Sequence, residues 1–157
     1  MLAVYGAWLT LHPTHYSWLD DLDLAIHEAG HPLFGIFGEF IGFAGGTLMQ
    51  LLVPAVFFGY FWRRQDRHAA TVMAWWTAQN LWNVARYIAD ARAQELPLVG
   101  GGEHDWAYLL GELGLLRHDV AIAHAVHFSG VLLFLWSCLA GWMFASAAGP
   151  PRPLPAP

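Results

Sequence analysis

LDLAIHEAGHPLFGIFGEFIGF, residues 22–43, is the stretch of this chain that decides its fold. The segment is almost entirely apolar, apart from two acids and the motif His27-Glu28-Ala29-Gly30-His31 near its centre. As an α-helix it is long enough to cross about 30 Å of bilayer hydrocarbon. A carboxylate and two imidazoles are costly in such a helix unless they have partners, so the motif indicates a functional site at membrane depth.

The spacing within the motif suits a bound metal ion. At about 100° per residue, positions 27 and 31 lie about 40° apart on the helix surface, so their rings point the same way. Neutral imidazole nitrogens are common zinc ligands, and zinc lowers the pKa of a bound water towards about 7. The motif therefore predicts His27 and His31 as zinc ligands and Glu28 as the base that takes a proton from that water.

The composition of the chain is typical of a membrane protein. Of the 157 residues, 57% are apolar and only 12% are charged, whereas soluble proteins carry about 25% charged residues. We therefore expect a single-domain integral membrane protein whose surroundings are the lipid bilayer. All seven basic residues are Arg, the formal net charge is -5, and no basic run is long enough to bind nucleic acid, so nucleic acid is not expected as a partner.

Four apolar segments are long enough, or nearly so, to cross a bilayer as helices, namely residues 22–43, 47–62, 69–89 and 120–147. Ser17-Trp18-Leu19-Asp20 has the pattern of a helix-capping box, so we expect the first of these helices to begin near residue 18. Pro32 predicts a kink in that helix. Gly45-Gly46 predicts a turn or an irregular strand between the first two segments.

The two ends of the chain are expected to lie outside these spans. Residues 1–11 are apolar and aromatic but too short to cross, and they lack a positively charged start and a cleavage site, so they predict a retained interfacial or re-entrant helix. Residues 149–157 are Pro-rich and predict a disordered tail. The expected fold is therefore all-α, a polytopic membrane helix bundle of about four transmembrane helices plus a short N-terminal interfacial helix, with one domain over residues 1–148.

Charge at the segment ends gives a weak indication of orientation. Arg63, Arg64 and Arg67 form the most basic loop, and the positive-inside rule places that loop in the cytoplasm. Three other arginines fall toward the opposite face and reduce this bias. With four crossings, both termini would also be cytoplasmic.

A zinc site needs at least one ligand besides the two histidines. The long connection between the third and fourth segments is polar and rich in glycine, and Asp105 begins a short helical pattern there that extends to Leu116. Asp105 suits a ligand because the preceding glycines allow close approach, but it would equally suit a helix N-cap. The residues alone leave the third ligand open among Asn80, Asn83, Asp90, His104, Asp105, His118, Asp119, His124 and His127.

Two further polar groups have more than one interpretation. His124 and His127 face together on the last segment and would suit a second cation or a haem, although packed histidines are commoner. Asn80 and Asn83, with Gln79 and Arg86, form a polar stripe on the third segment. Such a stripe usually makes interhelical hydrogen bonds, and in a metallopeptidase it could also bind a peptide backbone or an oxyanion.

These motifs resemble those of the site-two-protease class of membrane-embedded zinc metallopeptidases, and in particular its small bacterial branch. The likeness covers roughly residues 20–145 and consists of the His-Glu-Ala-Gly-His helix, a following Gly-Gly segment, and a Gly-rich loop that leads to Asp105-Trp106-Ala107-Tyr108-Leu109. The resemblance implies that His27, His31 and Asp105 bind zinc and that Glu28 activates water. It also implies a multi-pass protein of the bacterial inner membrane.

Three functions follow from these observations. The favoured one is an intramembrane zinc endopeptidase that acts on a transmembrane protein substrate. The alternative is a non-catalytic subunit that keeps the fold and packs against partner membrane proteins, since Pro32 and the lack of a Leu-Asp-Gly signature depart from the family's pattern. A haem or metal carrier is the third, for which covalent haem attachment is excluded because the chain has no Cys-x-x-Cys-His.

Overall fold

A computed structural model of the chain describes residues 1–12, 15–98 and 102–147, and all regular structure within them is helical. The predicted all-α class is therefore confirmed. A short 3-10 helix, η2 (Leu116–His118), precedes the last helix. The predicted tail over residues 149–157 lies outside the described residues. The α-helices of the described ranges are α1 (Leu2–Leu11), α2 (Trp18–Gly35), α3 (Glu39–Arg63), α4 (Arg67–Ala89), α5 (Asp105–Glu112) and α6 (Asp119–Ala147).

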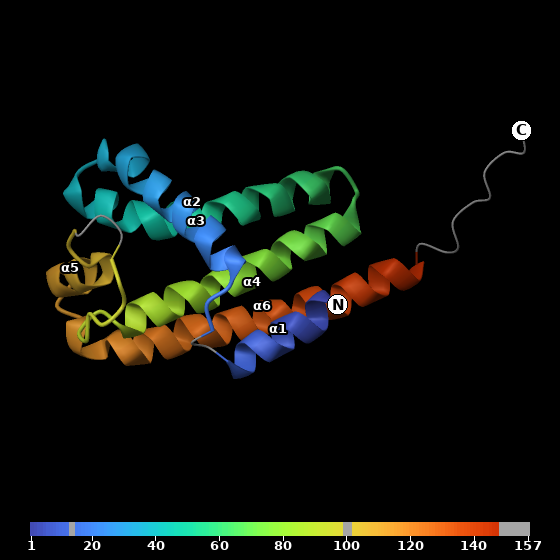
Figure 1. The fold of residues 1–157 in the computed structure, drawn as a ribbon. Coiled ribbons are helices and arrows are strands. Elements are labelled where there is room, and N and C mark those ends of the chain that lie inside the picture. The colour runs from blue at the N-terminus through green and yellow to red at the C-terminus, as the bar shows by residue number, and fades with distance from the viewer. Residues whose placement is uncertain (13–14, 99–101, 148–157) are drawn as a thin grey trace, which may run out of the picture.

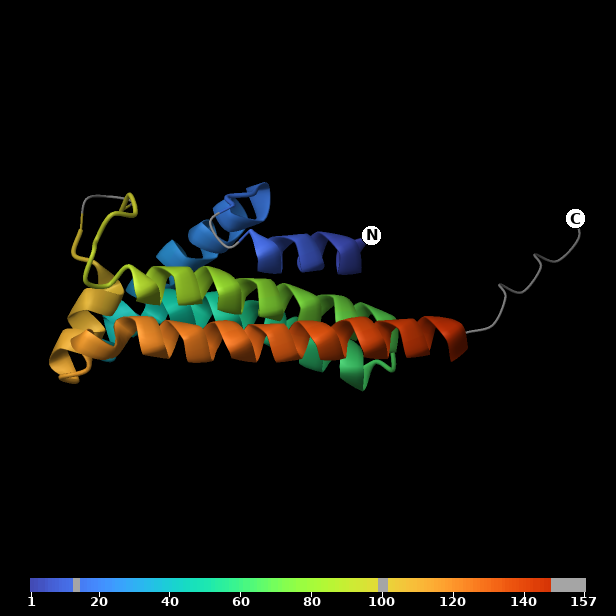
Figure 2. The ribbon, with the colours of Figure 1, turned by 90° about the horizontal axis from the view of Figure 1, so that it is seen from below.

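The three longest helices form one layer, with α4 between α3 and α6 (Figure 1). Helices α1 and α2 lie on one face of that layer, as the view from below shows (Figure 2). Helix α5 closes the end of the layer at which α2 turns into α3 (Figure 1). The motif-bearing helix α2 thus packs on α3, with α5 near its C-terminal end.

Helix α2 begins at Trp18, as the capping pattern predicts. The Asp20 carboxylate accepts hydrogen bonds from the Ser17 backbone N–H at 2.6 Å and from the Ser17 hydroxyl at 2.8 Å. It also accepts a hydrogen bond of 2.7 Å from the Asn83 side chain on α4. Asp20 therefore links the start of α2 to α4, the central helix of the layer.

The predicted single span over residues 22–43 is wrong, because the chain turns between Gly35 and Glu39. Gly38 has a φ of 109°, a conformation that glycine adopts without a steric penalty. Residues 39–46 belong to α3, which is therefore longer than the predicted second segment over residues 47–62. A largely apolar stretch of the sequence thus forms a helical hairpin, since apolarity by itself does not mark a turn.

The Gly45-Gly46 pair does not form the predicted turn or irregular strand, because both residues lie inside α3. Their role is close packing against α2. A Cβ atom at Gly45 would lie 2.7 Å from the carbonyl oxygen of Gly30, and one at Gly46 would lie 2.6 Å from two ring carbons of His27. The absence of side chains at these positions lets the two helices approach and leaves room for the imidazole.

Two helical stretches are long and apolar enough to cross a membrane by length and composition, Glu39–Arg63 and Leu116–Ala147. The sequence predicts about four spans. In the described part of the chain, length and composition support two of them and not the other two. Helix α2 carries several acids, and α4 carries the polar stripe that includes Gln79 and Asn80, both of which are buried. These polar residues lower the mean hydropathy of α2 and α4.

Candidate metal centre

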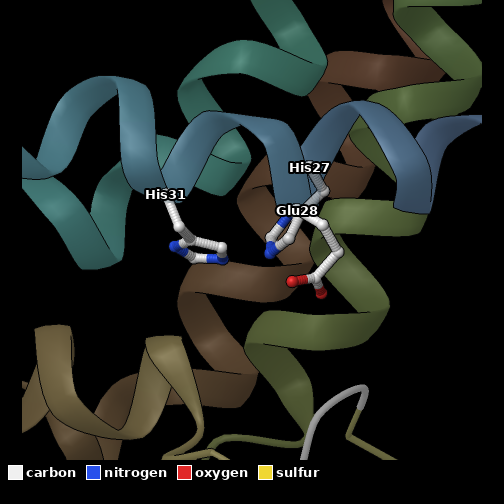
Figure 3. Close-up of side chains that lie close together, drawn as sticks. All are labelled: His27, Glu28 and His31. Atoms are coloured by element: carbon white, nitrogen blue, oxygen red, sulfur yellow. The ribbon is translucent and has the colours of Figure 1, made fainter.

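The motif residues converge on one side of α2. His27 and His31 come from successive turns of the helix, and their rings point away from α2 in the same general direction (Figure 3). Each of His27, Glu28 and His31 offers a ligand atom, and these atoms all lie within 4.8 Å of one another. His27 is buried, His31 is half-buried and Glu28 is exposed. The helical spacing that suggested a shared metal ion is therefore present.

Asp105, the first residue of α5, meets the two histidines. Its Oδ2 atom lies 2.9 Å from His27 Nε2 and 3.4 Å from His31 Nε2. Two atoms bound at about 2.1 Å to one tetrahedral zinc ion are themselves about 3.4 Å apart. A small outward shift of the carboxylate from His27 would therefore bring Asp105 to zinc-ligand spacing from both histidines.

The orientation of each imidazole is fixed by its other ring nitrogen. His27 Nδ1–H donates to the Gln50 side-chain oxygen at 3.2 Å, and His31 Nδ1–H donates to the Gly42 carbonyl at 2.9 Å. Both acceptors are oxygens that cannot donate, so the proton of each neutral ring is on Nδ1. The Nε2 lone pairs then face the cluster, which is the usual arrangement of metal-binding histidines.

The three atoms that meet at the centre are all electron-pair donors when the rings are neutral. Two Nε2 lone pairs and a carboxylate oxygen at these distances repel one another unless a cation lies between them. Either a proton or a metal ion meets that requirement. Where protons on the Nε2 atoms meet it, burial raises the pKa of the Asp105 carboxyl, but the hydrogen bonds donated by His27 and His31 outweigh burial and bring the pKa below its ordinary value. Asp105 is therefore a carboxylate at neutral pH, as a zinc ligand must be.

Asp105 is free to face the histidines because its neighbour caps the helix. The N-cap of α5 is His104, whose Nδ1 accepts a hydrogen bond from the Ala107 backbone N–H at 3.2 Å. The interpretation of Asp105 as an N-cap is therefore wrong. The Asp105 backbone N–H donates instead to the hydroxyl of Tyr87 on α4, at 3.2 Å.

Gln50 is a site residue that the sequence did not reveal. It is 3% exposed, and its amide N–H donates to the Asn83 side-chain oxygen at 3.1 Å. Because Asn83 in turn donates to Asp20, a chain of hydrogen bonds leads from the His27 ring to the start of α2. The one available signal was a side-chain amide in an otherwise apolar helix.

The other candidate ligands lie in different interactions. His104 and Asp90 face each other at 3.3 Å, and Asp119 pairs with Arg92 at 2.8 Å. Asn80 donates to a backbone carbonyl within α4. His118 contacts Arg117, while His124 and His127 lie on α6. Within the described residues, His27, Glu28 and His31 are the one group of three metal-ligating side chains close enough to share an ion.

Two cavities meet at the site. One has a volume of about 750 Å³ and extends towards Asp20 and Arg86, and the other has a volume of about 470 Å³ and extends towards Glu39 and Glu103. Among the described residues, those that line both cavities are His27, Glu28, Tyr87 and Leu98. The exposed carboxylate of Glu28 therefore lies where a water molecule and an extended chain could reach the cluster together.

Comparison with protein-family models, with curated proteins and with solved structures found no match to this chain. The likeness to site-two proteases therefore remains an interpretation of the motifs. Evidence about function comes from the geometry of the cluster and its surroundings.

Proposed function

We propose that this protein is a membrane-embedded zinc metallopeptidase that hydrolyses peptide bonds of membrane-anchored substrates. The observation that carries the proposal is the meeting of three electron-pair donors, from His27, His31 and Asp105, beside the exposed carboxylate of Glu28. Those three residues would hold a zinc ion, which when bound lowers the pKa of water and polarises the carbonyl of the scissile bond.

Glu28 is the proton carrier in this proposal. Its carboxylate accepts a proton from the attacking water and later delivers that proton to the amine as the C–N bond breaks. Gln50 and the Gly42 carbonyl act as positioning groups, because their hydrogen bonds hold the two rings with Nε2 towards the centre. Asp105, carried on α5, completes the ligand set.

The cavities support an endopeptidase. They extend from Glu28 in two directions, so a chain could continue on both sides of its scissile bond. A substrate helix must unwind to place an extended segment there, because its backbone carbonyls are otherwise engaged in helical hydrogen bonds. A transmembrane protein with a locally unstable helix fits this requirement.

The membrane arrangement in this proposal has four crossings, in the bacterial inner membrane. Helices α3 and α6 supply two of them. Helix α4 lies between those two and would cross with them, shielding its polar stripe from lipid (Figure 1). Helix α2, with 18 residues, spans about 27 Å and packs along α3. Helix α1 runs along the bundle, which favours the re-entrant form over one lying in the membrane plane (Figure 2).

A direct test compares the purified wild type with Glu28→Gln and His27→Ala in detergent. We expect equimolar zinc in the wild type and in Glu28→Gln, and little zinc in His27→Ala, by mass spectrometry of the metal. Cleavage of single-span peptides should occur with the wild type alone, because Glu28→Gln removes the proton acceptor and leaves the ligands intact. Zinc without cleavage in the wild type would favour the non-catalytic subunit, and a wild type that binds no zinc would overturn the proposal.

The third ligand has its own test. Asp105→Asn keeps the shape of the side chain but removes the charge that balances the metal, so zinc affinity should fall by about 10- to 100-fold or more. Glu103→Gln is the matched control, since Glu103 is an exposed acid two positions away and should leave the affinity unchanged. Equal zinc affinity in Asp105→Asn and the wild type would remove Asp105 from the ligand set.

A further inference from the structure

We infer that Tyr87 is a catalytic residue whose hydroxyl donates a hydrogen bond to the oxyanion formed during peptide hydrolysis. The inference deepens the peptidase function proposed above and rests on it. Its basis is the placement of an uncommitted, neutral hydrogen-bond donor between the two cavities.

The Tyr87 ring is held in place at the junction of the cavities. It is among the four residues that line both, together with Glu28. Its centroid lies 4.2 Å from that of the His104 ring and 5.8 Å from that of the His27 ring. Packing between a capping residue and a proposed zinc ligand fixes the direction of the hydroxyl, as preorganised catalysis requires.

The Tyr87 hydroxyl has its oxygen engaged and its proton available. The oxygen accepts the hydrogen bond from the Asp105 backbone N–H at 3.2 Å. No acceptor for the hydroxyl proton is found within hydrogen-bonding distance among the described residues. The Tyr87 hydroxyl is therefore in direct contact with the backbone of Asp105, a proposed ligand residue. Its proton is free to form a hydrogen bond with a group that enters the cavity.

The neighbouring donors on Gln50, Asn83 and Arg86 line only the larger of the two cavities, and each already donates a hydrogen bond to another residue. The Gln50 amide donates to Asn83, the Asn83 amide donates to Asp20, and Arg86 is paired with that same carboxylate at 3.3 Å. Of the four residues that line both cavities, His27 faces Asp105, Glu28 is an anion, and Leu98 has an apolar side chain. Among the described residues, Tyr87 is thus the side chain on this shared surface that offers a neutral donor.

The proposed step needs such a donor. As the water oxygen attacks the carbonyl carbon, the electron pair of the C=O π bond moves to the carbonyl oxygen, and Glu28 takes a proton from the water. The Tyr87 O–H keeps its proton and stabilises the new negative charge by a hydrogen bond. When the tetrahedral species collapses, the C–N bond breaks, the amine receives the proton from Glu28, and the Tyr87 hydroxyl returns to its initial state.

The test compares Tyr87→Phe with the wild type, with Tyr108→Phe as the matched control. Phenylalanine keeps the ring packing and removes only the hydroxyl. We expect kcat for a single-span peptide to fall by roughly 10- to 100-fold with KM changed by less than about twofold, since loss of one oxyanion donor is felt mainly in the transition state. Tyr108, stacked on Phe43 at 4.1 Å and absent from the lining of either cavity, should tolerate the change.

Two readouts separate a catalytic role from a structural one. Zinc affinity should be the same in Tyr87→Phe and the wild type, whereas affinity for a phosphonamidate peptide, which carries a tetrahedral oxyanion, should fall by at least about tenfold. Loss of zinc from Tyr87→Phe would show that the hydroxyl acts by holding Asp105, and would overturn the catalytic role. Wild-type kcat in Tyr87→Phe would overturn the inference and leave the proposed peptidase intact. A wild type that does not cleave would overturn both.

Discussion

Gly46 gives the His27 ring its place in the cluster. A Cβ atom at this position would lie 2.6 Å from the Cδ2 and Cε1 atoms of the ring, which is closer than real side chains approach. Gly46→Ala should therefore push the imidazole out of line with Asp105 and lower zinc affinity by at least about tenfold. Equilibrium competition with a chromophoric chelator would measure the change.

Gly59→Ala is the control for this prediction, because Gly59 lies in the same helix and a Cβ atom there would meet nothing within 4 Å. It should keep the zinc affinity and stabilise α3 by up to about 1 kcal/mol, the difference in helix propensity between alanine and glycine. If both variants bound zinc like the wild type, the close approach at Gly46 would have no part in the site.

The residues of the centre differ in how far the sequence could predict them. His27, Glu28 and His31 share one helix, so the helical repeat alone fixes their relation. Asp105 is 78 positions from His27, and its side chain was indistinguishable from a helix cap until the neighbouring His104 was seen to cap α5. Gln50 and Tyr87 depend on packing between helices, which local patterns do not encode.

At the scale of helices, Gly30 and Gly45 allow α2 and α3 to pack closely in their hairpin. A Cβ atom added to Gly30 would lie 2.7 Å from the carbonyl carbon of Gly45, and one added to Gly45 would lie 2.7 Å from the carbonyl oxygen of Gly30. Backbone atoms cannot move aside as a flexible side chain can, so the two helices would have to separate. Gly30→Ala should therefore destabilise the fold by about 1–3 kcal/mol, as overpacking does, and should weaken zinc binding as well.

Gly35→Ala is the control that tests whether the loss of stability in Gly30→Ala comes from the close helix contact or from replacing any glycine of α2. Gly35 ends the same helix, and a Cβ atom there would meet nothing within 4 Å. Thermal unfolding in detergent should show a lower midpoint for Gly30→Ala and an unchanged or slightly higher one for Gly35→Ala. Equal midpoints for Gly30→Ala and the wild type would mean that α2 and α3 are not packed as described.

The same hairpin explains where the sequence-based division into helices failed. The start of α2, the end of α4 and the extent of α6 follow from a capping pattern and apolar patterns, which are local. The turn at Gly38 lies within a largely apolar run, where the single acid Glu39 did not lower the hydropathy enough to mark the boundary. What identifies it is the positive φ of Gly38, a property of the folded backbone.

At the scale of the whole molecule, the bundle has two ends of different character. The turn between α3 and α4 carries Arg63, Arg64 and Arg67, whereas the other end carries α5 and the candidate metal ligands (Figure 1). If α4 and α6 both cross the bilayer, these ends lie on opposite sides. The positive-inside rule then places the arginine turn in the cytoplasm and the candidate metal centre near the outer face.

Cysteine labelling tests this topology, since Cys138 is the only native cysteine and Cys138→Ala gives a blank background. A thiol reagent that cannot cross membranes should label Leu113→Cys, beside α5, in intact cells, because Leu113 is 57% exposed. It should label Arg64→Cys only after the membrane is opened. Labelling of both cysteine variants from outside the cell would mean that α4 does not cross the membrane. If the protein were soluble, both variants would appear in the cytosolic fraction after the cells are opened. If Arg64→Cys were labelled in intact cells and Leu113→Cys only in opened cells, α4 would still cross the membrane. The candidate metal centre would then lie at the cytoplasmic face, and the orientation inferred from the arginines would be wrong.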